Sequence, residues 1–170
     1  RCEPTEARSP GGGCDILPTR EAEMSEFEVR PITPGTTYEL RRALLRPHQR
    51  VHEMTWPGDE DPTTLHLGGF RAEHLVGIGT IHHQPMPGST EYEAWRIRGL
   101  AVDYGHRGYG LGALMLFRLI DHATISAGKV VWANATATAF GFFEHHGFRR
   151  RGEPFELPEI GPHYVVYTEL

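Results

Sequence analysis

A glycine-rich turn between a strand-like run and a long helical pattern constrains the fold of this chain more than any other feature. Residues 92–102 alternate as a strand does, the turn follows at 107–112, and a helical pattern of about 17 residues then ends at Gly128. The short apolar run at 129–133 indicates a buried strand. Strand, helix and strand in this order imply a right-handed crossover, so we expect the two strands to be parallel neighbours.

The other segments complete an α+β pattern. Alternating runs indicate strands at residues 27–32, 64–70, 75–82, 148–155 and 163–169. Helical periodicity indicates one helix at 36–46, ended by Pro47, and another that begins after Asn134 as its N-cap and ends before Gly147. The order of elements contains no internal repeat and no linker to a second domain, so we expect helices packed on one sheet.

Length and charge exclude several classes of protein. A chain of 170 residues can bury the core of one domain. Its net charge of -5 comes without a dense Lys/Arg stripe, so we expect no nucleic-acid partner. No apolar run approaches the roughly 20 residues that span a bilayer, so we expect no membrane partner either.

Residues 1–23 differ from the rest in composition. This Pro-, Gly- and Glu-rich stretch lacks the pattern of a signal peptide, so we expect a disordered leader or a non-native extension, with Met24 as the natural start and one domain at 24–170. Both cysteines, Cys2 and Cys14, lie in it, so the domain has no thiol for a disulfide, a zinc site or a covalent nucleophile. A reducing compartment, the cytoplasm, fits this usage.

The turn Arg107-Gly108-Tyr109-Gly110-Leu111-Gly112 suits a phosphate. A helix N-terminus offers free amides and the positive end of a dipole, glycines permit the unusual dihedrals of an anion-binding nest, and Arg107 adds charge. A P-loop would need a Gly-Lys-Ser/Thr ending, and a Rossmann fingerprint would need the glycines directly after the strand and an acid near Asn134. A tight turn without a ligand is the remaining structural alternative.

Two blocks around this turn resemble the GNAT superfamily of N-acetyltransferases. Residues 95–112 are similar to its apolar strand followed by a Q/R-x-x-G-x-G/A turn, with Arg107, Gly110 and Gly112 at the motif positions. Residues 132–148 are similar to its asparagine, helix and Gly-Phe stretch, and the ending at 161–164 resembles a poorly defined branch of the superfamily. Such motifs say more about fold and cofactor than about substrate.

The resemblance implies a fold and an activity. The fold is a mixed, mostly antiparallel sheet of about six to seven strands, with helices on both faces and one parallel strand pair that splays apart. The activity is direct transfer of an acetyl group from acetyl-coenzyme A, as co-substrate and without a metal, to a primary amine of a small molecule. The alternative is a non-catalytic coenzyme A-binding sensor or interaction module with a degenerate site. The oligomeric state stays open, with a homodimer as one option.

The resemblance also assigns residues to the coenzyme. Backbone groups of Leu100, Ala101 and Val102 would pair with the pantetheine arm as an added strand does, and the amides of 107–112 would hold the diphosphate. The other side of the opening would be lined by Asn134, Phe140 and Phe143. Phe140 and Phe143 have helical spacing, so plain core packing fits them equally well.

Catalytic candidates follow from the chemistry of acetyl transfer, which needs a base for the amine and an acid for the leaving thiolate. Related enzymes place a tyrosine as the acid where this chain has Phe143, and a phenyl ring has no proton to give. The candidates are therefore His163 at the entry to the last strand, its neighbour Tyr164, and Glu93 at the start of the strand before the turn.

Substrate contacts are less determined. Arg96 and Arg98 share one face of the strand before the turn and would suit a substrate carboxylate, while a solvated or internally paired strand face explains them as well. The irregular connection at 47–63 is a candidate for substrate-facing structure. His48 and His52 have the spacing of a metal pair, but no third ligand is evident, so no metal is expected.

Overall fold

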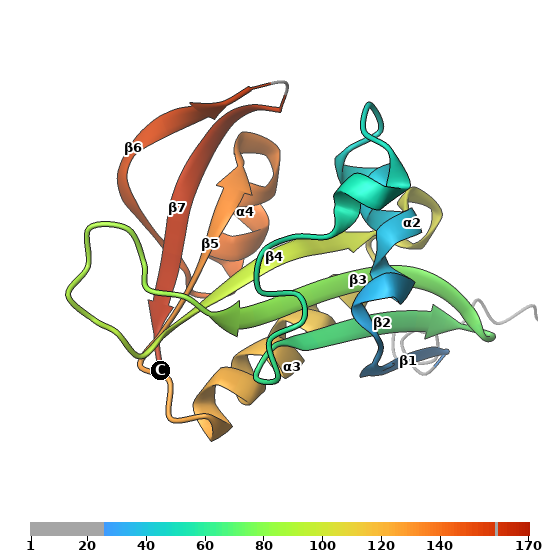
Figure 1. Cartoon of the computed structure of the whole chain (residues 1–170), viewed down its shortest axis with the longest axis horizontal. Helices are drawn as coiled ribbons and strands as arrows, with labels where there is room; N and C mark the ends of the chain where they lie inside the picture. Colours follow the sequence, from blue (N-terminus) through green and yellow to red (C-terminus); the bar gives the residue numbers. More distant parts are fainter. Residues whose placement is uncertain (1–25, 159) are drawn as a thin grey trace, which may run out of the picture.

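Within residues 26–158 and 160–170, which the computed structural model describes, the chain forms one seven-stranded sheet and three α-helices (Figure 1). The strands are β1 (Phe27–Pro31), β2 (Leu65–Arg71), β3 (His74–His83), β4 (Ala94–Val102), β5 (Val130–Thr136), β6 (Arg149–Leu157) and β7 (Gly161–Glu169). The helices are α2 (Pro34–Leu45), α3 (Leu111–Ile125) and α4 (Ala137–His145), with short 3₁₀ turns η1 (Val51–Met54) and η2 (Tyr104–His106).

The sheet is mixed, with the strand order β1-β2-β3-β4-β5-β7-β6. Neighbouring strands are antiparallel except β4 and β5, which are parallel and joined by the crossover through α3. The predicted α+β class, the splayed parallel pair and the mostly antiparallel sheet are confirmed.

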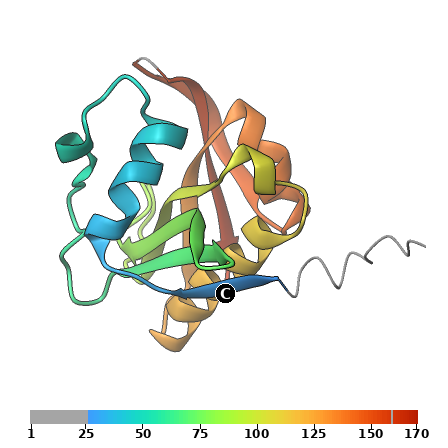
Figure 2. The ribbon, with the colours of Figure 1, turned by 90° about the vertical axis from the view of Figure 1, so that its right-hand side faces the viewer.

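Helices cover both faces of the sheet (Figure 2). On one side, called the α2 face below, Arg41 of α2 reaches Thr80 of β3. On the opposite side α3 and α4 pack over the main core. α3 lies close to the sheet because β2 and β3 carry glycines beneath it: a Cβ on Gly69 would stand 2.8 Å from Leu111 Cδ1.

Two element boundaries differ from the prediction in ways that bear on the site. Asn134 is not the N-cap of α4, because β5 continues through it to Thr136, which pairs with His163 of β7. Thr136 caps the helix instead, and its hydroxyl oxygen accepts a hydrogen bond from the Ala139 amide at 3.2 Å. β7 begins at Gly161, so His163 lies inside that strand rather than at its entry.

The predicted leader at residues 1–23 and the start at Met24 lie outside the described residues and stay predictions. Among the described helices, none has the length and apolar character needed to cross a membrane.

Candidate active site

The parallel strands β4 and β5 separate partway along their length. They pair from Ala94 to Ile97 on β4 and from Val130 to Ala133 on β5, and the register ends there. At the same level β4 carries a bulge, because Gly99 and Leu100 together face the single residue Gly79 of β3, and Gly99 has a φ of +65°. The backbone of Leu100, Ala101 and Val102 therefore runs along one side of an opening whose other side is the end of β5.

The glycine-rich turn stands where β4 leads into α3. Gly108 and Gly110 have φ values of +86° and +89°, a conformation that side chains with a Cβ disfavour. Gly110 is the N-cap of α3 and offers no capping side chain, so the first-turn amides from Leu111 onward lack a side-chain acceptor. These amides are suited to an anion.

The side chains around the turn are arranged by packing. Arg107 donates from Nε to the Val102 carbonyl at 2.8 Å, and its guanidinium lies 3.9 Å from the Tyr104 ring centre. Tyr109 is half-buried beside them. A Cβ on Gly112 would lie 3.6 Å from a Phe142 ring carbon, an ordinary contact distance, so Gly112 stands where α3 meets α4.

The phenylalanines of α4 divide between three surroundings. Phe143 is buried among Phe142 and Phe148, at centroid distances of 5.5 and 5.1 Å, so it packs in the core, and its predicted place along the opening stays a prediction. Phe140 stacks on Tyr164 of β7, 5.5 Å away. Phe142 is the ring beside the turn. Sequence periodicity selected Phe140 and Phe143 and missed Phe142, because its contact with the turn joins two helices that are distant in the sequence.

Asn134 stands on β5 just past the last rung that joins it to β4. Its side-chain Oδ1 is buried and has no hydrogen-bond partner among the described residues. Because an unpaired buried carbonyl costs free energy, a donor from a bound molecule fits this position. Asn134 therefore remains a candidate for the far side of the opening, although not as a helix cap.

A buried polar network ties the 47–63 connection to the α2 face. Asp59 accepts hydrogen bonds from both terminal nitrogens of Arg41, from Arg98 Nη2 at 3.1 Å and from the Trp56 amide at 2.8 Å. Burial alone would raise the pKa of Asp59, but these hydrogen bonds and the charges of Arg41 and Arg98 hold it below its ordinary value. Thr80 joins the network through Arg41.

Two further residues bring this network to the opening. The Trp56 ring contacts both arginines, with its centre 4.1 Å from the guanidinium of Arg41 and 5.3 Å from that of Arg98. A Cβ on Gly99 would meet the same ring at 3.0 Å. The connection that the sequence suggested as substrate-facing thus covers the bulge of β4 on the α2 face.

His163 and Tyr164 point to opposite faces of β7 because neighbouring residues in a strand alternate. His163 is 4% exposed and pairs with Thr136 at the open end of β5. Its Nδ1 lies 2.8 Å from the Gly161 carbonyl, which can only accept, so Nδ1 carries the proton and Nε2 of the neutral ring keeps a lone pair. Tyr164 turns to the α4 side, under Phe140 and the Arg150 guanidinium.

Glu93 and the two arginines of β4 are separated by the structure. Glu93 immediately precedes β4 at the end distant from the turn, is exposed, and lies 4.0 Å from His83, so it is not brought together with His163. Arg98 is paired with Asp59 and with the Pro57 carbonyl. Arg96 keeps a neutral partner, Gln84, at 3.2 Å.

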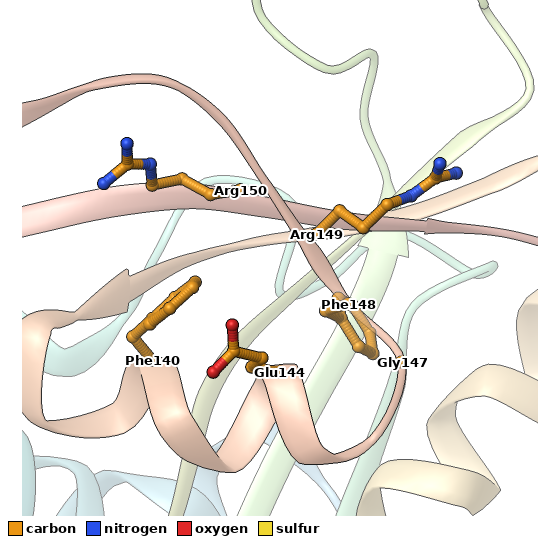
Figure 3. Close-up of a pocket in the computed structure, with 6 residues that line it drawn as sticks. All are labelled: Phe140, Glu144, Gly147, Phe148, Arg149 and Arg150. Atoms are coloured by element: carbon orange, nitrogen blue, oxygen red, sulfur yellow. The ribbon is translucent and has the colours of Figure 1, made fainter.

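Two surface hollows occur in the described part of the chain, one on each side of β6 and its turn. The larger, about 610 Å³, lies between α4 and β6 (Figure 3) and is lined by Phe140, Glu144, Gly147, Phe148, Arg149 and Arg150. A smaller one of about 200 Å³ lies between the end of α2 and the β6–β7 turn, lined by Leu45, Arg46, Pro47, His48, Gln49, Pro158 and Ile160. His52 lies in η1, outside that lining, and no cluster of three metal-ligating side chains occurs in the described part of the chain.

The sequence is similar to those of known N-acetyltransferases. A family model for the acetyltransferase (GNAT) domain matches residues 43–160. YitI of Bacillus subtilis (strain 168), an uncharacterized N-acetyltransferase, is 35% identical over 145 residues, which are 85% of this chain and 97% of YitI.

Solved structures agree in fold. A GNAT-family acetyltransferase from Streptococcus pneumoniae superposes with a TM-score of 0.63 at 16% identity, over 85% of this chain and 99% of that one. An aminoglycoside 6'-N-acetyltransferase complexed with coenzyme A gives a TM-score of 0.64 at 14% identity, over 84% and 96%.

The splayed parallel pair, the glycine turn and these matches define an N-acetyltransferase. The chain belongs to the GNAT acetyltransferase family.

Proposed function

We propose that the chain transfers an acetyl group from acetyl-coenzyme A directly to the primary amine of a small molecule. The observation that carries the proposal is the opening between β4 and β5, which leads to the uncapped N-terminus of α3. An extended pantetheine arm can pair with the edge of β4 at residues 100–102, where the Val102 carbonyl also accepts from Arg107. Its diphosphate can reach the first-turn amides of α3, which receive no capping side chain from the described residues. The buried Oδ1 of Asn134, which has no partner within residues 26–158 and 160–170, supports the same placement from the β5 side.

Acetyl transfer needs only a base, a donor to the carbonyl oxygen and a proton for the leaving thiolate. The neutral amine attacks the thioester carbon, a C–N bond forms, the C–S bond breaks, and the amine loses a proton while the thiolate gains one. His163 is the proposed base, because its Nε2 lone pair is free when Nδ1 donates to Gly161. A main-chain amide near Ala101 or Val102 is the proposed donor to the carbonyl oxygen. Phe143 has no proton to give, so the thiolate takes its proton from His163 or from water.

The proposed acceptor is small. The hollow of about 200 Å³ between the end of α2 and the β6–β7 turn has room for part of a compact amine. A cytoplasmic location, a homodimer and the absence of nucleic-acid, membrane and metal partners remain predictions from the sequence.

A coenzyme A-binding module without catalysis is the second candidate, and Phe143 in place of a phenol favours it. Steady release of free thiol from acetyl-coenzyme A with a panel of primary amines, with the acetylated product confirmed by mass spectrometry, separates the two. A pure binding module would retain affinity and release no thiol above the rate without protein.

Arg107→Gln is expected to weaken acetyl-coenzyme A binding about tenfold or more, because a charge-assisted hydrogen bond to the diphosphate is lost. Titration calorimetry measures this, with Arg118→Gln on the exposed side of α3 as the matched control. S-acetylpantetheine, which lacks the diphosphate, should bind both variants and the unmodified protein equally. Equal loss for both ligands would contradict the diphosphate assignment.

A further inference from the structure

On the α2 face, arginine side chains outnumber the buried carboxylates of the described residues. Arg41, Arg96 and Arg98 stand on it, whereas Asp59 supplies the one buried carboxylate among the described residues. Asp59 is already occupied by Arg41 and Arg98. Removing a charge from water costs free energy that a paired ion of opposite sign offsets, so Arg96 is the arginine of this face best suited to bind an added anion.

The surroundings of Arg96 supply no negative charge. Its guanidinium lies 4.9 Å from the Trp132 ring centre, and its Nε is buried without a hydrogen-bond partner among the described residues. Burial lowers the pKa of Arg96 with no carboxylate in the described chain to offset it, whereas Asp59 partly offsets the same effect at Arg98. Of these three arginines, Arg96 is therefore the one whose charge is not offset by a carboxylate of the described chain.

His82 stands beside Arg96 with a second unpaired group. The two residues are Cα partners on β3 and β4, and the buried Nε2 of His82 has no partner in the described chain. Burial, with the charges of Arg98 and Arg96, lowers the pKa of His82 to about 4, so the ring is neutral at pH 7. A neutral ring protonated at Nε2 is a donor, and one carboxylate could accept from His82 and Arg96 together.

Two further acids of the described chain come near this pair, and the charge of Asp61, like that of Asp59, partly offsets the lowering of the His82 pKa. Asp61 Oδ1 is exposed and accepts from the amide and hydroxyl of Thr63. Glu93 is exposed and faces His83. No carboxylate of the described chain pairs with Arg96, so its guanidinium is available to an anion from another molecule.

Arg96 also lies within reach of the reaction. One rung on, β4 and β5 separate, and the unpartnered Asn134 follows on β5. Arg96 and Arg98 are two residues apart on one strand, about 7 Å, which a small bifunctional molecule can span. If the anionic end of such a molecule binds Arg96, its amine end can reach the opening between β4 and β5.

We propose that the acceptor amine also carries a carboxylate, as an amino acid does, and that Arg96 and His82 bind this carboxylate. The inference rests on the acetyl transfer proposed above and names its substrate class.

The test compares amino acids from glycine to 5-aminopentanoate with their primary amides, with rates referred to the unprotonated amine. At least one acid should exceed its amide tenfold or more in kcat/KM. Arg96→Gln should lower this acid-to-amide ratio about ten- to hundredfold, which is the loss of a hydrogen bond to a charged group. Arg96→Lys keeps the charge without the planar fork and should retain part of the ratio.

Arg149→Gln is the matched control, because it removes the same charge on the same sheet from an exposed arginine that pairs with Glu169. It should leave the ratio unchanged. Amides acetylated as well as acids by the unmodified protein would overturn the inference, and so would an equal fall for acid and amide in a folded Arg96→Gln variant.

A binding measurement separates this inference from the proposed function. Histidine NMR on the full chain should show the pKa of His82 rising when 4-aminobutanoate is added, and not when its amide is added, because a nearby anion favours the protonated ring. If no amine is acetylated, acetyl transfer fails as the function while this shift still decides the carboxylate site. An unchanged His82 titration at saturating 4-aminobutanoate would overturn the site.

Discussion

Asp59→Asn is expected to lower the free energy of unfolding by about 3–5 kcal/mol, the usual cost of removing one partner from a buried ion pair. The reason is that Arg41, with no exposed side-chain surface, would keep its charge and lose its carboxylate, while Arg98 would lose the same partner. Urea denaturation at pH 7 measures the change. Glu60→Gln, an exposed neighbour, should stay within about 0.5 kcal/mol of the unmodified protein.

The ion pair of Asp59 and Arg41 should also change how the free energy of unfolding depends on pH. The pKa of Asp59 is lower in the folded protein than its ordinary value of about 3.9, so its stabilising effect is complete above that value. The effect is lost as the pH falls through the folded-state pKa. The unmodified protein should therefore lose more stability below pH 4 than Asp59→Asn does. Identical acid profiles, or a loss under about 1 kcal/mol at pH 7, would show that the connection is held by other contacts.

The local part of the site could be predicted from the sequence. The glycine turn, the helix after it and the next strand are contiguous, so their periodicity and the handedness of the crossover determine the parallel pair. The cap of α4 was misplaced because Asn134 suits a cap by residue type, while pairing with β7, distant in the sequence, carries the strand on to Thr136. Tertiary pairing overrode the local preference.

The buried network could not be predicted in the same way. Arg41, Asp59, Thr80 and Arg98 come from four separate segments, and the sequence pattern of each fits an exposed face. For Arg98 the sequence left a substrate carboxylate and an internal pair open, and the partner that decides between them, Asp59, comes from another segment. The contact between Gly112 and Phe142 was missed for the same reason, because it joins two helices.

His163→Ala is expected to lower kcat about a hundredfold, the low end for loss of a general acid or base, with little change in acetyl-coenzyme A affinity. The physical basis is the hydrogen bond from Nδ1 to Gly161, which fixes the tautomer and leaves Nε2 able to take a proton at the open end of β5. His74→Ala is the matched control, because His74 makes the same bond to the carbonyl two residues before it, at the exposed β2–β3 turn.

His163→Asn separates proton transfer from hydrogen bonding, because an amide keeps polarity but does not titrate between pH 5 and 8. If His163 takes the proton of the acceptor amine, the asparagine variant should be as slow as the alanine variant, and the pH profile of kcat should lose one limb in both. If His163→Asn keeps most of the kcat of the unmodified protein, His163 positions the substrate by hydrogen bonding and does not transfer the proton. Wild-type kcat and an unchanged profile in both folded variants would make the histidine structural, and the amine would then have to lose its proton to water.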